Sequence, residues 1–205
     1  MKRLFLSACL VAATAFGQYK LESAGAPPAE LAPEIRAALQ NDGARISGPN
    51  GVFCEVWWRV KVPSSPNHES SVSFTDIAQG ALLGAIRFPG KGADRRAQPL
   101  KPGVYTLRLS FFPVDGAHQG VSQTRDFALL TPAADDRDPN ATPTFDQLVA
   151  MSKKASGTPH PAILNLWKAD SPGPAALKQE GDDWVLYSTM GGQPVALIVV
   201  GAYAG

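Results

Sequence analysis

The stretch LKPGVYTLRLSFF, from Leu100 to Phe112, decides the fold class because it joins a tight turn to a regularly alternating strand. The residues Lys101–Val104 predict a type II turn, since proline presets the second position and glycine accepts the positive φ of the third. Side chains then alternate, with one face made of Tyr105, Leu107, Leu109 and Phe111 and the other of Thr106, Arg108 and Ser110. We predict a half-buried strand and a contact from Tyr105 back to the turn, like the tyrosine corner of β-sandwiches.

The same alternation recurs along most of the chain and predicts an all-β fold. Nearly all of the 18 prolines fall outside the alternating runs, as expected if the run interiors need their N–H groups for a ladder. No strand–helix–strand alternation is present, which favours a mainly antiparallel, jelly-roll-like β-sandwich over a doubly wound sheet. About nine runs read as strands: 44–47, 52–61, 71–76, 81–88, 104–112, 124–130, 162–168, 184–189 and 195–200.

Two short helices are expected beside these strands. Apolar residues recur at helical spacing at Leu31, Ile35, Ala38 and Leu39. With Pro33 in an early-turn position, they predict a helix over about residues 33–42. A second helix is expected over about residues 144–154, where Thr144 and Gln147 fit a capping box.

Residues 1–17 have the pattern of a secretory signal peptide. Lys2 and Arg3 form a basic start, Leu4–Ala13 is apolar, and small residues follow as a cleavage site. The motif ending at Cys9 resembles a bacterial lipobox, but the apolar run before it is shorter than the roughly seven to fifteen residues of an h-region. We therefore expect cleavage without lipid anchoring, and a secreted or periplasmic protein.

The remainder of the chain predicts a single domain. Residues 18–27 read as an extended tether, and residues 28–205 as one β-sandwich domain that includes both helices and is long enough to bury a core. No later run reaches the roughly 20 apolar residues of a membrane-spanning helix. Without the two basic residues of the signal peptide, basic and acidic side chains nearly balance and form no block of like charge, which argues against nucleic acid as a partner.

The strand expected over residues 52–61 has two different faces. One face carries Val52, Cys54, Val56, Trp58 and Val60. As the sole cysteine left after cleavage, Cys54 can form no internal disulfide, and we expect a small buried hydrophobe. The other face carries Phe53, Glu55, Trp57, Arg59 and Lys61. Aromatic rings among charged groups are typical of sugar-binding faces, so Trp57 and Arg59 are candidate ligand-binding residues. The alternative is that the N-terminal helix covers Trp57 as part of a second core.

Three segments carry a resemblance to a known kind of protein. They are Ile46-Ser47-Gly48-Pro49, Glu55-Val56-Trp57-Trp58-Arg59 and Leu100-Lys101-Pro102-Gly103-Val104-Tyr105-Thr106-Leu107. This order resembles uncharacterised secreted bacterial proteins of the domain-of-unknown-function kind, in which a tryptophan-arginine strand precedes an L-x-P/A-G-x-Y-x-L strand. The match runs from Ile46 to Phe112, with a weaker echo at Trp184. The resemblance implies a β-rich exported domain and brings no catalytic residue with it.

The loop after the strand of residues 104–112 is the main candidate site. It holds Asp115 and His118 next to the end of the scaffold, where ligand contacts are often placed. The alternative from another class is a secreted hydrolase or metal-dependent enzyme, with a loop-built site around His118 and His160. No G-x-S-x-G, H-E-x-x-H, phosphate-loop or dinucleotide motif is present. The sequence thus favours a role without catalysis and without a cofactor.

A calcium-like spacing precedes the second helix. Asp136, Asp138 and Asn140 place oxygen ligands at alternate positions, as at the start of an EF-hand loop. The rest of that loop differs, because Ala141 stands where glycine is needed and Gln147 where a bidentate glutamate is needed. The three residues are candidate metal ligands, and the alternative is a solvated acidic turn before a helix N-terminus.

The predicted function follows from these exclusions. We expect an exported, non-catalytic binding or envelope-associated module. Its partner would be an unknown small molecule, a glycan or an envelope protein, held by Asp115 and His118 or by the face of Trp57 and Arg59. A further alternative is a structural component of a cell-surface assembly, which an exposed edge strand or a stable oligomer would favour.

Overall fold

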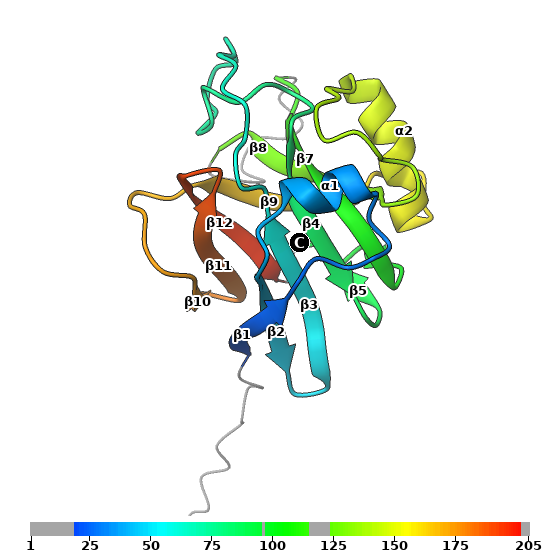
Figure 1. Cartoon of the computed structure of the whole chain (residues 1–205), viewed down its shortest axis with the longest axis vertical. Helices are drawn as coiled ribbons and strands as arrows, with labels where there is room; N and C mark the ends of the chain where they lie inside the picture. The colour runs from blue at the N-terminus through cyan, green and yellow to red at the C-terminus, as the bar shows by residue number, and fades with distance from the viewer. Residues whose placement is uncertain (1–18, 96, 115–123, 202–205) are drawn as a thin grey trace, which may run out of the picture.

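The structure is a computed structural model that describes residues 19–95, 97–114 and 124–201, and it is dominated by one antiparallel sheet (Figure 1). The sheet has ten strands in the order β1-β2-β3-β4-β7-β8-β9-β12-β11-β10. Their bounds are β1 Lys20–Gly25, β2 Gly43–Gly48, β3 Gly51–Trp58, β4 Leu82–Phe88, β7 Gly103–Phe111, β8 Asp126–Pro132, β9 Ile163–Lys168, β10 Ala176–Glu180, β11 Asp183–Met190 and β12 Gln193–Val200. The predicted all-β, mainly antiparallel fold is confirmed.

The sheet curls until its two edge strands come close, so that it resembles a nearly closed barrel as much as a sandwich. β1 and β10 stand at opposite ends of the strand order, yet residues of the two strands approach each other. No ladder of hydrogen bonds joins them in the part of the chain that the structure describes. A short second sheet pairs β5 (Gly92–Ala93) with β6 (Pro99–Leu100). The line where β1 and β10 meet without pairing is called the seam below.

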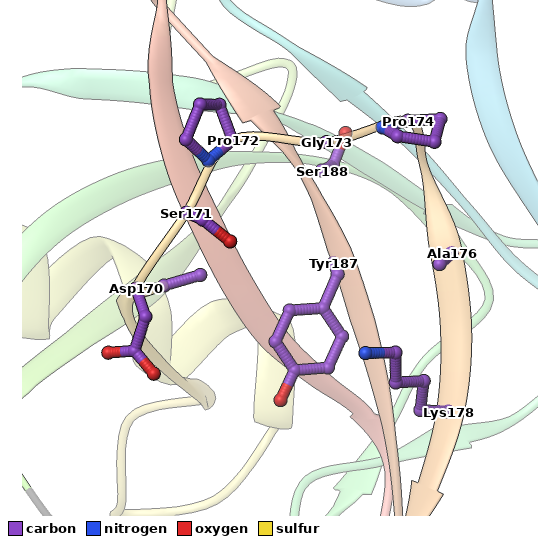
Figure 2. A pocket seen from close by; sticks show the side chains of 10 residues that line it. Asp170, Ser171, Pro172, Gly173, Pro174, Ala176, Lys178, Tyr187 and Ser188 are labelled. Atoms are coloured by element: carbon purple, nitrogen blue, oxygen red, sulfur yellow. The ribbon is translucent and has the colours of Figure 1, made fainter.

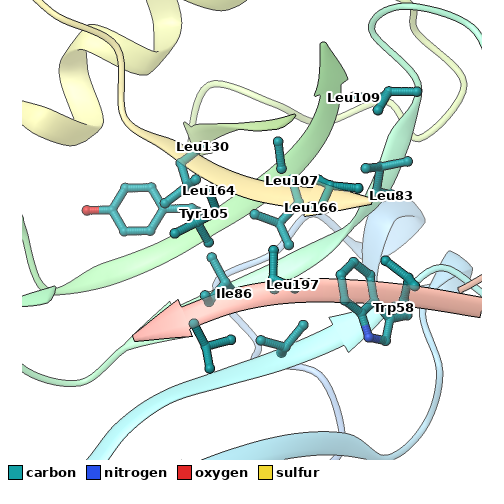
Figure 3. Packing of buried hydrophobic residues seen from close by; sticks show 14 of the residues in the cluster. Trp58, Leu83, Ile86, Tyr105, Leu107, Leu109, Leu130, Leu164, Leu166 and Leu197 are labelled. Atoms are coloured by element: carbon teal, nitrogen blue, oxygen red, sulfur yellow. The ribbon is translucent and has the colours of Figure 1, made fainter. Parts of the chain in front are cut away.

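The main core fills the inside of the curled sheet. Almost every strand contributes inward-facing side chains to this core, and many of them are leucines, as Figure 3 shows for β4, β7, β9 and β12. Side chains of this core include Trp58, Leu83, Ile86, Leu107, Leu109, Leu130, Leu164, Leu166 and Leu197. Burying each such side chain stabilises the fold by about 1.5–3 kcal/mol. Cys54 lies fully buried in the same core, as predicted.

The predicted contact from Tyr105 back to the turn of residues 101–104 is present. The Tyr105 hydroxyl donates to the carbonyl oxygen of Lys101 at 2.7 Å. The strand itself differs from the prediction, because its polar face is also covered. Thr106, Arg108 and Ser110 are all fully buried. β7 therefore lies at the centre of the molecule with both faces packed.

Both predicted helices are present. α1 spans Pro33–Ala38, which is shorter than the predicted 33–42, because the chain becomes extended at Leu39 and forms a bridge with Arg59. α2 spans Phe145–Ser156 and packs beside β8 (Figure 1). The predicted capping box is confirmed: the backbone N–H of Gln147 donates to the Thr144 hydroxyl at 3.3 Å, and the Gln147 side chain accepts from the Thr144 N–H at 2.9 Å.

Residues 71–76 form turns rather than the predicted strand. The buried carboxylate of Asp126 accepts hydrogen bonds from the backbone N–H groups of Ser73 at 2.7 Å and Phe74 at 3.0 Å. The side-chain amide of Asn67 donates to the Phe74 carbonyl oxygen at 2.7 Å. These backbone groups are therefore unavailable for a ladder. The segment instead inserts Phe74 into the main core.

Residues 18–27, predicted as a tether, contain strand β1. Lys20–Gly25 is extended as expected, but it pairs with β2 instead of being free, with Leu21 opposite Ile46. Just before β1, the Tyr19 ring packs against Trp184 of β11, with ring centroids 5.5 Å apart. Tyr19 thus crosses the seam and joins the first strands to the last ones.

The two helices are short, and no helix among the described residues is long and apolar enough to cross a membrane. α1 lies over β3 and β4 (Figure 1), and α2 packs against β8, which lies between β7 and β9 in the sheet. Each helix therefore covers an outer face of the curled sheet and leaves the seam uncovered.

Candidate functional site

Trp57, a predicted ligand-binding residue, is a buried structural residue. Only 1% of its surface is exposed, and its indole Nε1–H donates to the carbonyl oxygen of Gly25 at 2.7 Å. The side chains packed around it come from α1, β4 and their neighbours: Leu31, Ala32, Ile35, Leu39, Leu82, Ala85 and Ala133. The structure thus matches the alternative in which the N-terminal helix covers Trp57. The ring presents no face on which a sugar could stack.

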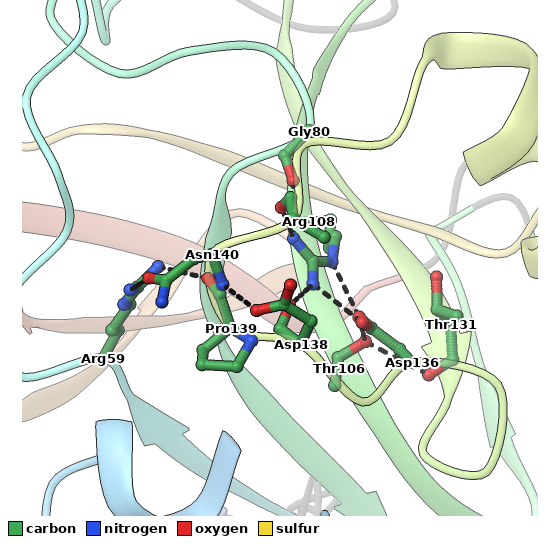
Figure 4. A network of polar contacts seen from close by, with 10 residues as sticks. Arg59, Gly80, Thr106, Arg108, Thr131, Asp136, Asp138, Pro139 and Asn140 are labelled. Atoms are coloured by element: carbon green, nitrogen blue, oxygen red, sulfur yellow. Dashed lines mark hydrogen bonds and ion pairs between the residues drawn. The ribbon is translucent and has the colours of Figure 1, made fainter. Parts of the chain in front are cut away.

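Arg59, the second predicted residue of this face, is also buried and holds a loop in place (Figure 4). One guanidinium nitrogen donates to the carbonyl oxygen of Pro139 at 2.7 Å, and another donates to Oδ1 of Asn140 at 2.8 Å. Both acceptors belong to the loop that precedes α2. The side chain of Arg59 therefore fastens this loop to the end of β3.

Asp136, a candidate metal ligand, is the counter-ion of a buried arginine. Arg108 forms a bidentate ion pair with Asp136, in which Nε donates to Oδ2 and Nη2 donates to Oδ1, both at 2.7 Å. The hydroxyl of Thr106 donates to the same carboxylate. Arg108 also donates to the carbonyl oxygens of Gly80 and Asp138 at 2.9 and 2.6 Å (Figure 4). We call these residues the Arg108 network.

The calcium-like spacing therefore does not converge on a cation. The Asp136 carboxylate is taken by Arg108, whose positive charge occupies the place of a metal ion. Asp138 instead accepts the backbone N–H of Asn140 at 2.8 Å, which shapes the turn. Within residues 19–95, 97–114 and 124–201, no three histidine, cysteine, aspartate or glutamate side chains are grouped to hold a metal ion. The predicted role of these residues as metal ligands is not supported; they hold a loop.

Two of the candidate ligand-binding residues, Asp115 and His118, lie outside the described residues. The site predicted around His118 and His160 therefore stays a prediction. His160 is exposed in the loop after α2, and its carbonyl oxygen accepts from the Ser156 hydroxyl at 2.6 Å. His68 is exposed in a different loop, before the turns of residues 71–76.

A pocket of about 320 Å³ opens at the seam, and we call it the seam pocket. It lies between β1 and β2 on one side and β11 with the segment before β10 on the other. Its lining residues are Leu21, Glu22, Ser23, Gln40, Asp42, Gly43, Ala44, Val56, Trp58, Ala175 and Ser188. Strands from the two ends of the sheet thus build one cavity, because the curled sheet brings them together.

Trp58 is the unusual residue of the seam pocket. Its side chain is only 2% exposed and packs in the main core (Figure 3). Its indole Nε1–H has no hydrogen-bond partner within the described parts of the chain. A buried donor without an acceptor costs about 1–3 kcal/mol. Trp58 therefore brings an unsatisfied buried donor to the wall of the seam pocket.

Polar groups at the rim of the seam pocket are held in fixed positions. Asp42 accepts from the Ser23 hydroxyl at 2.6 Å and from the backbone N–H of Gly25 at 2.9 Å. The Ser23 hydrogen bond and then the Gly25 N–H lower the pKa of Asp42 below its ordinary value. Gln40 crosses the seam, where its side-chain nitrogen donates to the carbonyl oxygen of Thr189 at 3.0 Å. The rim is therefore rich in oriented acceptor oxygens.

A second pocket, of about 380 Å³, lies against β10 and β11 beneath the loop of residues 169–174 (Figure 2). Two of its polar side chains have partners in the protein. The Tyr187 hydroxyl donates to Glu180, and the Lys178 ammonium lies 4.7 Å from the centre of the Tyr187 ring. Burial and then Glu180 raise the pKa of Tyr187 to about 12, so the phenol stays protonated. This pocket has no buried orphan group and is the weaker candidate.

Sequence reasoning missed the seam pocket. Trp58 was placed correctly on the Cys54 face of β3, but that pattern cannot reveal that its N–H lacks an acceptor. Nor can the sequence show that β1 and β11 meet, since they lie far apart along the chain. No protein-family model, curated protein or solved structure matches this chain. The function is therefore inferred from the geometry and chemistry of the pocket.

Proposed function

We propose that the protein is an exported, non-catalytic binding module whose small-molecule ligand occupies the seam pocket. The observation that carries this proposal is the seam pocket itself, a cavity of about 320 Å³ built by strands from both ends of the sheet. Trp58, which lines it, holds a buried indole N–H without an acceptor among the described residues. Export is supported by the signal-peptide pattern of residues 1–17 and by the resemblance to secreted bacterial proteins of the domain-of-unknown-function kind.

The place and size of the seam pocket suit a small ligand. Clefts of about 300–1,000 Å³ at the mouths of barrels are common ligand sites, and about 320 Å³ is near the lower end of that range. Trp58 and Val56 belong to β3, which is paired with β2 on one side and β4 on the other. A site on rigid strands needs little ordering when the ligand binds, which favours affinity.

The groups around the pocket support binding over catalysis. The pKa of Asp42 is lowered, so this carboxylate stays ionised near neutral pH and suits a fixed charge better than proton transfer. Among the described lining residues, no histidine, lysine or cysteine stands beside it as a second proton-transfer group or nucleophile. A pocket of this kind holds and orients a ligand.

The exposed edges argue against a role in strand-to-strand assembly. β1 carries Lys20 and Glu22, and β10 carries Lys178 and Glu180, all of them exposed. Charged side chains on edge strands oppose pairing with another chain. The seam is therefore proposed to receive a small molecule and not an added strand.

The test blocks the pocket without disturbing the core. Ala175 is exposed and lines the pocket, so Ala175→Trp fills it from the solvent side. Ala134→Trp adds the same bulk at an exposed position that does not line the pocket. A library of small polar molecules is screened by thermal shift and ligand-observed NMR on the mature protein. We expect hits that bind the wild type and Ala134→Trp but not Ala175→Trp.

Two results would contradict the proposal. One is hits that bind all three proteins equally, which would place the ligand elsewhere. The other is the absence of any saturable hit across the library, given that a ligand bound to the native state raises its melting temperature.

A further inference from the structure

We infer that residues 19–25, called the strap below, gate the seam pocket: they detach from β2 as one unit, hinged at Gly25, and so admit a ligand. The inference rests on the proposed function and adds how the ligand enters the site. It follows from the burial of the strap, from the contacts at its two ends and from its share of the pocket wall.

The strap is only lightly packed against the protein. None of residues 19–25 is fully buried, whereas the chain is buried again at Pro28 and Leu31. β1 pairs with β2 on one side, and among the described residues no ladder joins it to β10 on the other. Segments with few buried apolar contacts open locally, at a smaller free energy than global unfolding. The strap is therefore able to open while the rest of the sheet stays folded.

The end of the strap at Gly25 is a fixed hinge. The Gly25 carbonyl oxygen accepts from the Trp57 indole N–H at 2.7 Å, and the Gly25 N–H donates to Asp42 at 2.9 Å. Gly25 has a φ of 69°, which favours glycine, and the β1–β2 register shifts between Ser23 and Gly25. The β1–β2 ladder thus ends at a residue that two hydrogen bonds hold in place, and the strap moves about that residue.

The opposite end of the strap is closed by the Tyr19 ring. Its centroid lies 5.5 Å from that of Trp184 and 5.9 Å from that of Phe53. A Cβ atom on Gly48 would come within 2.6 Å of the same ring, so the ring packs directly on the Gly48 backbone. Tyr19 itself is only partly buried. The ring therefore latches the strap across the seam through surface contacts.

Opening of the strap removes one wall of the seam pocket. Leu21 and Ser23 line the pocket from the strap, and Val56 lines it from β3. None of the Val56 surface is exposed while the strap is closed. β3 and β11 are each paired on both sides, so the walls that they form stay in place. Release of the strap therefore exposes the inner wall of the pocket at Val56.

The experiment measures opening in two independent ways on the mature protein. Native-state hydrogen exchange at low urea concentrations gives opening constants for the backbone amides of β1, β7 and β10. Thiol labelling of Val56→Cys, in a Cys54→Ala background, gives the opening constant of the pocket wall. Wild type, labelled at Cys54, is the matched control, because Cys54 is equally buried on the same strand and does not line the pocket.

We expect β1 amides to exchange about 100-fold faster than β7 amides, at a rate that changes little with urea, because local opening exposes little surface. The opening constant of Val56→Cys should match that of β1 within about threefold, and that of Cys54 should match β7. Tyr19→Ala should raise the opening constants of β1 and Val56→Cys about tenfold and leave β10 unchanged. Phe145→Ala, which removes an exposed ring on α2, should change none of them.

Three results would overturn the inference. β1 amides that share the urea dependence of β7 would show that β1 opens only by global unfolding, and this test needs no variant. Labelling of Val56→Cys as fast as an exposed thiol would show that the pocket is open while the strap is closed. Labelling of Val56→Cys as slow as Cys54 would show that the strap does not gate the pocket. Ligand binding is decided separately, by the library screen with Ala175→Trp, so the proposed function survives each of these results.

Discussion

Trp57 and Trp58 are neighbours on β3, yet the structure uses them in opposite ways. Trp57 faces outward beneath α1 and donates its indole N–H to the Gly25 carbonyl oxygen. Trp58 faces the main core, and its indole N–H has no acceptor among the described residues. The difference teaches that burial alone does not identify a site. A satisfied buried polar group holds the fold, whereas an unsatisfied one is a cost to the fold and directs attention to the cavity beside it.

The contrast extends to the surroundings of each tryptophan. On the outer face, buried Glu55 forms ion pairs with Arg45 and Arg87, and Arg108 pairs with Asp136. Charge is balanced there within the protein. At the seam, Asp42 carries a charge without an ion-pair partner among the described residues. The ion pairs of the outer face are therefore formed within the protein, while the seam pocket is lined by Asp42, which has no ion-pair partner among the described residues.

The largest expected effect comes from breaking the Arg108 network. Arg108→Met leaves the Asp136 carboxylate buried without its counter-ion, and such losses cost about 3–5 kcal/mol. Urea unfolding monitored by circular dichroism measures this loss. The control is Lys154→Met, which removes an exposed ion pair with Asp135 and should cost less than about 1 kcal/mol. Similar small losses for both variants would show that the outer face is not held by this pair.

The two tryptophans themselves give the next largest effect. Trp57→Phe and Trp58→Phe remove the same atoms from buried sites, but only the first breaks a hydrogen bond. We expect Trp57→Phe to lower the free energy of unfolding by about 1–2 kcal/mol more than Trp58→Phe. Denaturant unfolding of both variants measures the difference. A larger loss for Trp58→Phe would indicate that its N–H has an acceptor and would weaken the case for the seam pocket.

The smallest expected effect is the pH dependence of Asp42. Its pKa is lower in the folded protein than its ordinary value of 3.8, so the carboxylate stabilises the fold above pH 3.8, and that stabilisation is lost as the pH falls through the folded pKa. The difference in unfolding free energy between wild type and Asp42→Asn should stay constant above about pH 5 and narrow below pH 3.8. Urea titrations at several pH values measure it. A difference that widens toward low pH would contradict the account.

Local sequence rules predicted the parts of the fold that depend on neighbouring residues. The capping box of Thr144 and Gln147 and the contact from Tyr105 to Lys101 were confirmed because each is formed within a few residues. The burial of Cys54 was confirmed because alternation assigns it to the inward face of β3. Short-range geometry is encoded directly in such patterns.

The missed features depend on partners that are distant in the sequence. Residues 71–76 have the pattern of a strand, but Asp126 captures their N–H groups from another part of the chain. Alternation placed Trp57 and Trp58 on opposite faces and could not tell which face a helix would cover. The seam pocket needs the curled sheet to bring β1 next to the last strands. Tertiary contacts of this kind override local preference.

The most direct test of the central claim is an NMR titration that observes the indole N–H groups separately. The mature protein is labelled with ¹⁵N-tryptophan, the signals of Trp57 and Trp58 are assigned from their phenylalanine variants, and a small molecule that bound in the library screen is added stepwise. The account predicts a saturable shift of the Trp58 indole signal, because Trp58 lines the pocket that the ligand fills, while the Trp57 signal stays in place. A Trp58 signal that does not move while the ligand binds, or one that moves no more than that of Trp57, would contradict the claim that the seam pocket is the binding site.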